Sequence, residues 1–235
     1  MKLLKNGYHD AFTNMGIDEA LMKTCSEPVL RLYGWKPSAV SIGYFQGLEE
    51  EVDLAVAQKE GVSVVRRITG GGAVFHDAEL TYSFVTREFE ENILDSYRQI
   101  CGAVLSGLKT IGIEGQFAPL NDLILGGKKF SGNAQTRKNG VLLQHGTILL
   151  DVDVDRMFSL LKVPSEKMRD KIVSDVKMRV TGIGKSFDEV ASALEAGFEE
   201  TYGVNLETMD FSSEQENFAK EAAERYASKE WLRLR

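Results

Sequence analysis

The sequence is poor in cysteine and contains no long apolar run. Its 235 residues include two cysteines, Cys25 and Cys101, and their wide separation suits neither a disulfide framework nor a zinc site. Met1 to Asp10 contain no apolar run of signal-peptide length, and no later stretch is long enough to cross a bilayer. We therefore expect a cytoplasmic protein whose length lets it bury a sizeable core without covalent cross-links.

An excess of positive charge and internal linkers are also absent. The formal net charge is -7, which speaks against a general nucleic-acid binder, because such proteins rely on an excess of Lys and Arg. No low-complexity segment, internal repeat or linker rich in Pro, Gly or Ser interrupts the sequence. With 43% hydrophobic and 27% charged residues, the composition is ordinary for a globular protein, and we expect one continuous domain over residues 1–235.

The order of the predicted elements indicates the fold class. Apolar residues at steps of three and four predict a helix over Ile93–Ile111. Gly126-Gly127 and Asn139-Gly140 predict the turns of two hairpins. The other expected elements are strands at Val29–Trp35, Ala39–Gly43, Val62–Ile68, Glu79–Thr86, Asp122–Leu125, Lys128–Phe130, Asn133–Arg137 and Val141–Asp151, and helices at Thr13–Cys25 (capped by Asn14), at Asp53–Glu60, from Ser186 and from Ser213. This order predicts an α+β fold with a mixed, largely antiparallel sheet packed against helices.

The segment from Arg66 to Asp77 is the first candidate for a ligand site. Two arginines precede three consecutive glycines, Gly70 to Gly72, whose backbone N–H groups can form an anion-binding nest. Consecutive glycines lose backbone entropy on ordering, which is usual only where the backbone approaches something closely. The segment is neither a Walker A loop nor a dinucleotide fingerprint. With Arg66, Arg67 and His76 beside the glycines, we favour a ligand loop over a wide turn between strands.

The second candidate region contains Lys128 and Lys129. Neighbours in a strand face opposite sides of the sheet, so one lysine can point inward and stabilise charge on a phosphoryl or acyl oxygen. The alternative is a solvated pair on an edge strand. Asp122 is a candidate Mg²⁺ ligand. His145 lies in an apolar strand, where a histidine is more often a satisfied core group than a catalyst.

At these segments the sequence resembles the catalytic domain of lipoate–protein ligases, in the biotin/lipoate ligase superfamily. Residues 66–77 match the signature of that family almost letter for letter. Further blocks that resemble the family follow in its order at residues 14–20, 43–46, 121–123, 129–134 and 145–147. The resemblance covers essentially the whole chain to Trp231.

The resemblance implies a fold shared with biotin ligases and the activity of an ATP-dependent lipoate–protein ligase. ATP and lipoate would first give lipoyl-AMP and pyrophosphate, with Mg²⁺ screening the triphosphate. A lysine of an acceptor lipoyl domain would then attack the lipoyl-AMP. The acceptors would be the acyltransferase subunits of 2-oxo acid dehydrogenases and the glycine cleavage H protein.

The resemblance also implies roles for individual residues. Lys129 would be the catalytic residue, in contact with both the α-phosphate and the lipoyl carbonyl. Arg67 would hold phosphate or the lipoyl carboxylate. The residues expected to bind ATP or lipoyl-AMP are Arg67, Gly70, Gly71, Gly72, Ala73, Val74, Phe75, Lys129 and Thr147. Further candidates near the site are His76, Asn121, Asp122 and His145, with Asp122 as the candidate metal ligand.

Partners follow from the same resemblance. Many members of the family carry an accessory C-terminal domain, which we expect to be absent here. Either the chain acts alone, or a separate small subunit supplies the missing part. Arg137 and Lys138 flank a hairpin turn and are expected to face solvent, where they could steer an acidic acceptor protein. An ordinary solvated turn is the alternative explanation of this basic pair.

The main alternative activity is that of an octanoyl or lipoyl transferase of the same fold, acting on acyl-carrier or lipoyl proteins. Such a transferase needs a thiolate nucleophile, which we expect shortly before Lys129. Residues 117–125 contain no cysteine, and Cys101 lies beside the apolar stripe of the long helix.

Two further alternatives remain. A non-catalytic lipoate binder would have no need of Lys129 and Arg67. A biotin ligase fits less well, because His76 and Asp77, which follow the glycine segment (Gly70–Gly72) and its apolar neighbours, are typical of the lipoate branch.

Overall fold

Two β-sheets form the framework of the structure, a computed structural model that describes residues 1–163 and 169–235. The larger sheet has eight strands in the order β11-β1-β2-β6-β10-β9-β8-β7, and the smaller has three in the order β4-β3-β5. The strands are β1 (Lys2–His9), β2 (Val29–Trp35), β3 (Ala39–Ile42), β4 (Ser63–Arg66), β5 (Val74–His76), β6 (Glu79–Thr86), β7 (Gln116–Ala118), β8 (Asp122–Leu125), β9 (Lys128–Lys138), β10 (Val141–Leu149) and β11 (Glu207–Thr208). Most neighbouring strands are antiparallel, and β1 runs parallel to β2 and β11, as β3 does to β4.

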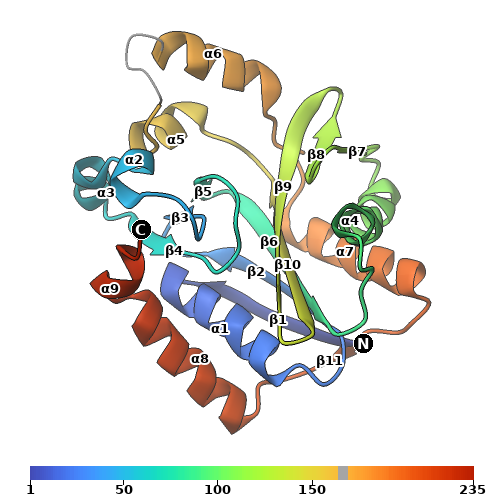
Figure 1. Cartoon of the computed structure of the whole chain (residues 1–235). Helices are drawn as coiled ribbons and strands as arrows, with labels where there is room; N and C mark the ends of the chain where they lie inside the picture. Colours follow the sequence, from blue (N-terminus) through green and yellow to red (C-terminus); the bar gives the residue numbers. More distant parts are fainter. Residues whose placement is uncertain (164–168) are drawn as a thin grey trace.

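Helices cover both faces of the larger sheet (Figure 1). The helices are α1 (Ala11–Thr24), α2 (Leu48–Glu51), α3 (Leu54–Glu60), α4 (Ile93–Thr110), α5 (Val154–Leu160), α6 (Arg169–Arg179), α7 (Phe187–Tyr202), α8 (Ser213–Tyr226) and α9 (Lys229–Leu232). The pair α4 and α7 covers one face, and α1 and α8 cover the other. The predicted α+β class, with a mixed and largely antiparallel sheet, is confirmed.

Side-chain alternation divides the residues of the sheet between these two faces. In β6, Leu80, Tyr82 and Phe84 pack into the core under α4 and α7. Their neighbours Ser83 and Val85 face α1 instead: Ser83 donates a hydrogen bond to Asp18 of α1, and Val85 joins the core cluster under that helix. The period of two in a strand therefore decides which side chains reach the α1 face, where the candidate site lies.

Several boundaries differ from those predicted. Helix α1 begins at Ala11, because the Asp10 side chain accepts hydrogen bonds from the backbone N–H groups of Phe12 and Thr13; Asn14 is therefore inside the helix and is not its cap. The two strands predicted on either side of residues 131–132 are one continuous strand, β9. Strand β1 was not predicted, because only two of its eight residues, the neighbours Leu3 and Leu4, are buried, and its side chains show no clear alternation.

The predicted hairpin turn at Asn139 and the predicted capping box at Ser186 are confirmed. Asn139 has a φ of 54° between β9 and β10, as a tight hairpin turn requires. Ser186 forms the predicted capping box with Glu189, and Gly203 ends that helix. The second capping box uses Ser212, one residue before the predicted start.

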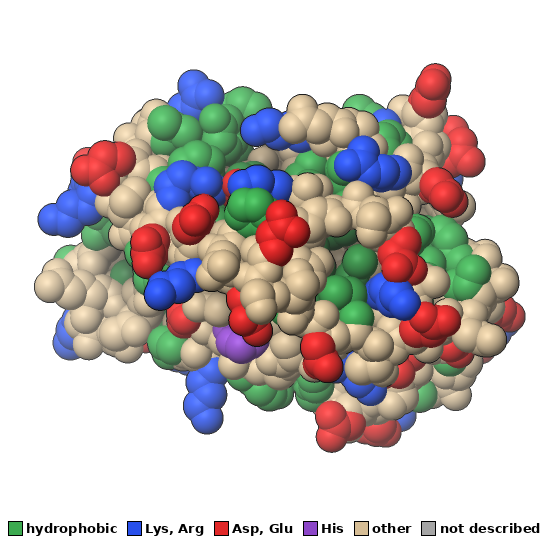
Figure 2. Space-filling view, turned by 90° about the horizontal axis from the view of Figure 1, so that it is seen from below, with side chains coloured by type: hydrophobic (Ala, Val, Ile, Leu, Met, Phe, Trp, Pro, Cys, Tyr) green, Lys and Arg blue, Asp and Glu red, His purple; other side chains and the backbone are tan. Residues whose placement is uncertain are grey.

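The surface carries charges of both signs. Figure 2 shows acidic and basic side chains interspersed over one face, with hydrophobic side chains in small groups between them. No helix among the described residues is long and apolar enough to cross a membrane.

Candidate active site

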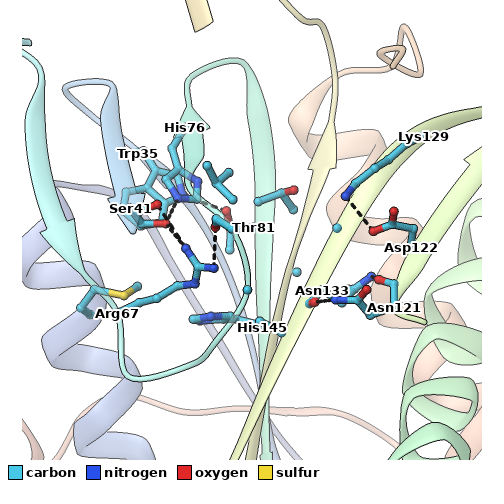
Figure 3. Close-up of a pocket in the computed structure, with 18 of the residues that line it drawn as sticks. Trp35, Ser41, Arg67, His76, Thr81, Asn121, Asp122, Lys129, Asn133 and His145 are labelled. Atoms are coloured by element: carbon cyan, nitrogen blue, oxygen red, sulfur yellow. Dashed lines mark hydrogen bonds and ion pairs between the residues drawn. The ribbon is translucent and has the colours of Figure 1, made fainter. Parts of the chain in front are cut away.

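A cavity of about 300 Å³ lies on the α1 face of the larger sheet, beside the smaller sheet. Its two sides are seen in Figure 3, with Arg67, Ser41 and His76 on one side and Lys129 and Asp122 on the other. The residues that line it are Met15, Tyr33, Trp35, Ser41, Arg67, Gly71, Gly72, Val74, His76, Thr81, Asn121, Asp122, Lys129, Gly132, Asn133, Ala134, His145, Gly146 and Thr147. The cavity thus brings together the glycine segment and the block at residues 129–134 that begins with Lys129, although the two are distant in sequence.

Lys129 is the lysine of the predicted pair that lines the cavity, while Lys128 is exposed and does not. The Nζ atom of Lys129 lies 2.7 Å from Oδ1 of Asp122, and the two side chains are 42% and 32% exposed. This ammonium therefore has a carboxylate partner and still contacts solvent. It can offset negative charge that develops on a substrate oxygen nearby.

Asp122 is accordingly engaged by Lys129. Within residues 1–163 and 169–235, no three His, Cys, Asp or Glu side chains cluster closely enough to hold a metal ion. A single carboxylate that already forms an ion pair is a poor start for a Mg²⁺ site. Ligation of Mg²⁺ by Asp122 stays a prediction without companion ligands among the described residues.

Asn121 and Asn133 are tied to each other beside Lys129. The Nδ2 of Asn133 donates to the Asn121 carbonyl at 2.9 Å, and the Nδ2 of Asn121 donates to the Asn133 carbonyl. The Tyr82 hydroxyl donates to Oδ1 of Asn133 at 2.6 Å across Gly146, on the face of the sheet that α4 and α7 cover. These contacts fix the strand that carries Lys129 at the edge of the cavity.

Arg67 is buried on the other side of the cavity and is already saturated with hydrogen bonds. Its acceptors are Oγ1 of Thr69, the carbonyl and hydroxyl oxygens of Ser41, and the carbonyl oxygens of Gly70 and Gly72. Burial lowers the pKa of Arg67 to about 10, so the guanidinium stays charged at neutral pH. The predicted contact of Arg67 with phosphate or carboxylate stays a prediction, and would require it to release some of these partners.

Arg66 points away from the cavity. Its guanidinium donates to the backbone carbonyls of Gly43, Tyr44, Gln46 and Leu232. The Trp231 indole N–H donates back to the carbonyl of Arg66 at 2.8 Å. The first arginine of the signature therefore fastens the C-terminal helix α9 and the segment after β3 to the end of β4.

Both candidate histidines are buried and hydrogen-bonded. His76 contacts Glu79 through Nδ1 at 2.7 Å and the Ser41 hydroxyl through Nε2 at 2.8 Å. His145 contacts Asp18 through Nδ1 at 3.3 Å and the Thr69 hydroxyl through Nε2 at 2.7 Å. Burial lowers the pKa of His145, which favours its neutral form.

Asp18 anchors the second of these groups. Burial opposes its charge, but the guanidinium of Arg31 at 2.7 Å and the hydrogen bond from His145 outweigh burial and lower the pKa of Asp18. Ser83 and Tyr33 also donate to its carboxylate oxygens. His145 therefore lies against a carboxylate that is ionised at neutral pH.

The remaining predicted residues lie around the glycine segment. Gly71, Gly72, Val74 and Thr147 line the main cavity. Ala73 and Phe75 line a second cavity of about 210 Å³, which shares Val74, Lys129, Gly132 and Thr147 with the first. Gly70 lines a groove of about 790 Å³ on the other side of the glycine segment.

Neither thiol belongs to the site. Cys101 is fully buried in α4, under the opposite face of the sheet, and Gln144 donates to its sulfur at 3.7 Å. Burial raises its pKa to about 12. Cys25 is buried at the end of α1, and its thiol donates to the carbonyl of Glu27 at 3.4 Å. Burial also raises the pKa of Cys25.

Several residues of this site had no predicted role. Asp18 falls inside a block that resembles the family, but an acidic residue within a helix gives no sign of burial. Thr69 lies within the signature at residues 66–77, where the glycines and arginines drew attention away from its hydroxyl. Trp35, Ser41 and Glu79 lie on strands outside the matched blocks, and only the tertiary structure joins these residues to the two histidines.

The basic pair at the hairpin also differs from expectation. Arg137 donates to the carbonyl of Glu91 and to the Ser96 hydroxyl, both at 2.6 Å, and its guanidinium lies 4.9 Å from the ring centre of Phe89. It therefore links the hairpin to the segment before α4, and its side chain is half-buried instead of freely solvated. Lys138 is exposed and lines the groove beside the glycine segment.

Comparison with known proteins contradicts the main expectation for activity. Octanoyltransferase LipM of Geobacillus kaustophilus is 35% identical to this chain and is aligned with 98% of it and 96% of its own length. Octanoyltransferase LipM of Bacillus subtilis gives the same figures. These names overturn the expectation of an ATP-dependent lipoate–protein ligase and favour the alternative, an octanoyl transferase of the same fold.

Solved structures confirm the fold and the family. A bi-partite lipoate protein ligase from Thermoplasma acidophilum, studied with its E2 lipoyl domain, has a TM-score of 0.93 and 34% identity over 98% of this chain and 95% of its own. A lipoate-protein ligase A bound with ATP has a TM-score of 0.88 and 31% identity over 98% of this chain and 97% of its own. The family described as "Lipoyl protein ligase A/B catalytic domain" matches residues 10–199. The chain therefore belongs to the lipoyl protein ligase A/B catalytic-domain family, whose members include lipoate ligases and octanoyltransferases.

Proposed function

We propose that this chain is an acyl transferase that moves an octanoyl group, or the similar lipoyl group, from an acyl-carrier protein to a lysine of a lipoyl-domain protein. The names of the octanoyltransferase relatives support the reaction type. The observation that carries the proposal at the level of geometry is the cavity with Lys129 at one side and the aromatic residues Tyr33 and Trp35 among its lining.

The cavity suits a medium-length acyl chain. Its volume of about 300 Å³ is at the lower end of the roughly 300–1,000 Å³ of small-ligand pockets. Met15, Tyr33 and Trp35 supply apolar surface for the chain. With the chain against Trp35, the carbonyl group would lie toward Lys129, which is on the opposite side of the cavity in Figure 3.

Lys129 supplies the electrostatic part of the chemistry. When an amine attacks a thioester carbonyl, negative charge develops on the carbonyl oxygen. The ammonium of Lys129 would offset that charge, and its ion pair with Asp122 at 2.7 Å would hold it in position. Proximity of the two reactants in the cavity would supply the rest.

The transfer is direct in this proposal, so it does not use the thiolate nucleophile that was expected of a transferase shortly before Lys129. The nitrogen of the acceptor lysine forms a bond to the acyl carbon, the carbon–sulfur bond breaks, and the departing thiolate takes up the proton that the nitrogen loses. No acyl-enzyme is needed, which accords with the burial of Cys25 and Cys101 away from the cavity. The second cavity, which shares Lys129 and Thr147 with the first, offers the second reactant a separate approach to the same ammonium.

Lipoyl domains of 2-oxo acid dehydrogenases and the glycine cleavage H protein are the proposed acceptors. The related bi-partite ligase was studied with an E2 lipoyl domain, which supports this class of acceptor. The resemblance to ligases left open whether the chain acts alone or with a separate accessory subunit; the proposed transfer needs no such subunit, and inactivity of the purified chain alone would favour one.

The test is acyl transfer in the absence of ATP. The purified chain is mixed with octanoyl-loaded acyl-carrier protein and an unmodified lipoyl domain, and the lipoyl domain is weighed by intact mass spectrometry. We expect a gain of one octanoyl group, and no gain on a lipoyl domain whose acceptor lysine is replaced by arginine. Modification that occurs only with ATP and a free fatty acid would contradict the proposal.

A further inference from the structure

Arg67 lies at the centre of the wall formed by the glycine segment. A guanidinium group has five N–H bonds, and Arg67 has five acceptors within 3.1 Å. Its Nη2 atom donates to the carbonyl oxygens of Gly70 and Gly72, each at 2.7 Å. None of the five acceptors is a carboxylate. The hydrogen bonds of this buried cation are therefore directed at two carbonyl oxygens of the loop, at the carbonyl oxygen of Ser41 and at two hydroxyl groups.

The backbone of the glycine segment, at residues 70–72, allows this contact with Arg67. Gly71, between the two bound carbonyls, has a φ of +92°, which side chains other than that of glycine rarely allow. A Cβ atom on Gly71 would lie 2.9 Å from Nη2 of Arg67. The loop therefore needs glycine at this position both for its backbone angle and for the close approach of the guanidinium.

One relay of hydrogen bonds reaches Arg67 through Ser41. Oε1 of Glu79 accepts from Nδ1 of His76 at 2.7 Å, and Nε2 of His76 lies 2.8 Å from the Ser41 hydroxyl. That hydroxyl accepts from Nη1 of Arg67 at 3.0 Å. The ring of Trp35 stacks on His76 with a centroid distance of 3.8 Å, which fixes the plane of the imidazole.

A second relay reaches Arg67 through Thr69. Oδ2 of Asp18 lies 3.3 Å from Nδ1 of His145, and Nε2 of His145 lies 2.7 Å from the Thr69 hydroxyl. That hydroxyl accepts from Nε of Arg67 at 3.1 Å. The two relays have the same order of groups: a carboxylate, a histidine, a hydroxyl and then the guanidinium.

This order has a chemical consequence. A carboxylate accepts hydrogen bonds, so it keeps the proton of each imidazole on Nδ1 and leaves Nε2 as an acceptor. The hydroxyl then donates its single hydrogen to Nε2 and presents its lone pairs to Arg67. Each carboxylate thus orients a hydroxyl toward the cation through a histidine.

We infer that Arg67 is a positioning residue, which holds the glycine loop in the shape of the cavity wall, and that the Glu79–His76–Ser41 and Asp18–His145–Thr69 relays act on the reaction through it. The inference rests on the proposed function only for its effect on the rate of transfer. The effect on the loop does not depend on which acyl donor the chain uses.

The test compares variants of Thr69 that differ in the hydroxyl. Thr69→Val removes the hydroxyl at nearly constant volume, and Thr69→Ser retains it. Hydrogen–deuterium exchange is measured on the substrate-free chain. We expect exchange of the amides at residues 68–73 to be about tenfold faster in T69V than in the wild type, nearly normal in T69S, and unchanged within α4 in both variants.

Kinetics then separate positioning from substrate contact. In the octanoyl transfer assay we expect kcat to fall about tenfold in T69V with little change in KM for the acyl carrier, and to recover in T69S. Arg67→Lys, which keeps the charge but loses the planar fork, should loosen the loop as T69V does.

Normal loop exchange in both R67K and T69V would overturn the inference. A raised KM with an unchanged loop would do the same, because it would place Arg67 in direct contact with the substrate. Since exchange is measured without substrates, an inactive wild-type chain would refute the proposed function and leave the test of the loop in force.

Discussion

At the scale of single residues, the two arginines and two lysines of the motifs have divided roles. Arg66 binds backbone carbonyls around the C-terminal helix, whereas Arg67 faces the cavity wall. Lys129 lines the cavity, and Lys128 is exposed. Strand alternation predicted that the lysines would separate, but it gave no basis for choosing between the arginines, whose acceptors are backbone atoms that no sequence pattern reveals.

Removal of the Lys129 charge should have the largest effect on the proposed reaction. We expect Lys129→Ala to reduce kcat/KM for octanoyl transfer by about 10²–10³-fold, the range for loss of one group that stabilises developing charge. The matched control is Lys128→Ala in the same strand, for which we expect a change of less than about twofold. Comparable activity of the two variants would remove Lys129 from the mechanism.

The buried His145 should make stability depend on pH. Because burial lowers its pKa below the unfolded value, the unfolded chain binds a proton at a higher pH than the folded chain does. The stability from neutral His145 is therefore present above the ordinary histidine pKa and is lost as the pH falls through the lowered one. His9, whose pKa burial also lowers, contributes with the same sign.

Urea unfolding checks this sign. The free energy of unfolding of the wild type should fall between about pH 7.5 and about pH 5.5, and His145→Gln should show a smaller fall over that interval. A wild-type stability that rises as the pH falls, or an equal fall in the variant, would refute the assigned shift.

At the scale of elements, helices with a clear apolar period were predictable and the long-range pairings were not. The stripe of α4, the turn at Asn139 and the cap at Ser186 are local patterns, and each is confirmed. Strand β1 was missed because its identity depends on parallel pairing with β2 and β11, to which its own residues give little clue.

The site, too, was predictable in its local blocks of sequence and not in its long-range contacts. The glycine segment and Lys129 are recognisable blocks of sequence, and the structure brings them to one cavity. The two histidine relays combine Asp18 with His145 and Ser41 with His76, pairs separated by 127 and 35 residues. Only the packing of α1 and β3 against the sheet creates these contacts.

The close packing of α4 against α7 leads to a prediction at this scale. A Cβ atom on Gly107 would lie 2.0 Å from the carbonyl oxygen of Ala193, so Gly107→Ala must separate the two helices. We expect a loss of about 1–3 kcal/mol in the free energy of unfolding. Gly102, in the same helix, has nothing within 4 Å of such an atom, and Gly102→Ala should stabilise by up to about 1 kcal/mol. Equal effects of the two substitutions in denaturant melts would argue against this helix packing.

At the scale of the whole molecule, the candidate site lies on the α1 face of the larger sheet, and the opposite face packs into the core under α4 and α7. Cys101 belongs to that core and Cys25 to the end of α1, so neither thiol shares the cavity with Lys129. This separation of thiols and cavity is the reason that the proposed transfer proceeds without an acyl-enzyme.

Thiol reactivity tests this separation. We expect neither cysteine of the folded chain to react with a disulfide reagent such as DTNB within the time of an activity assay, because both are buried and burial raises both pKa values. Both should react after unfolding in guanidinium. Rapid modification of one thiol together with loss of transfer, or an octanoyl adduct on a cysteine after acid quenching, would show that the reaction uses an acyl-enzyme.

The central claim is that the acyl group comes from a carrier thioester and not from a free acid activated by ATP. A competition measures this directly: the chain and a lipoyl domain receive acyl-carrier protein loaded with deuterated octanoate, together with unlabelled free octanoate, ATP and Mg²⁺. Intact mass spectrometry of the lipoyl domain then reports the source of the acyl group. The account predicts the deuterated mass, and the appearance of the unlabelled mass alone would contradict it.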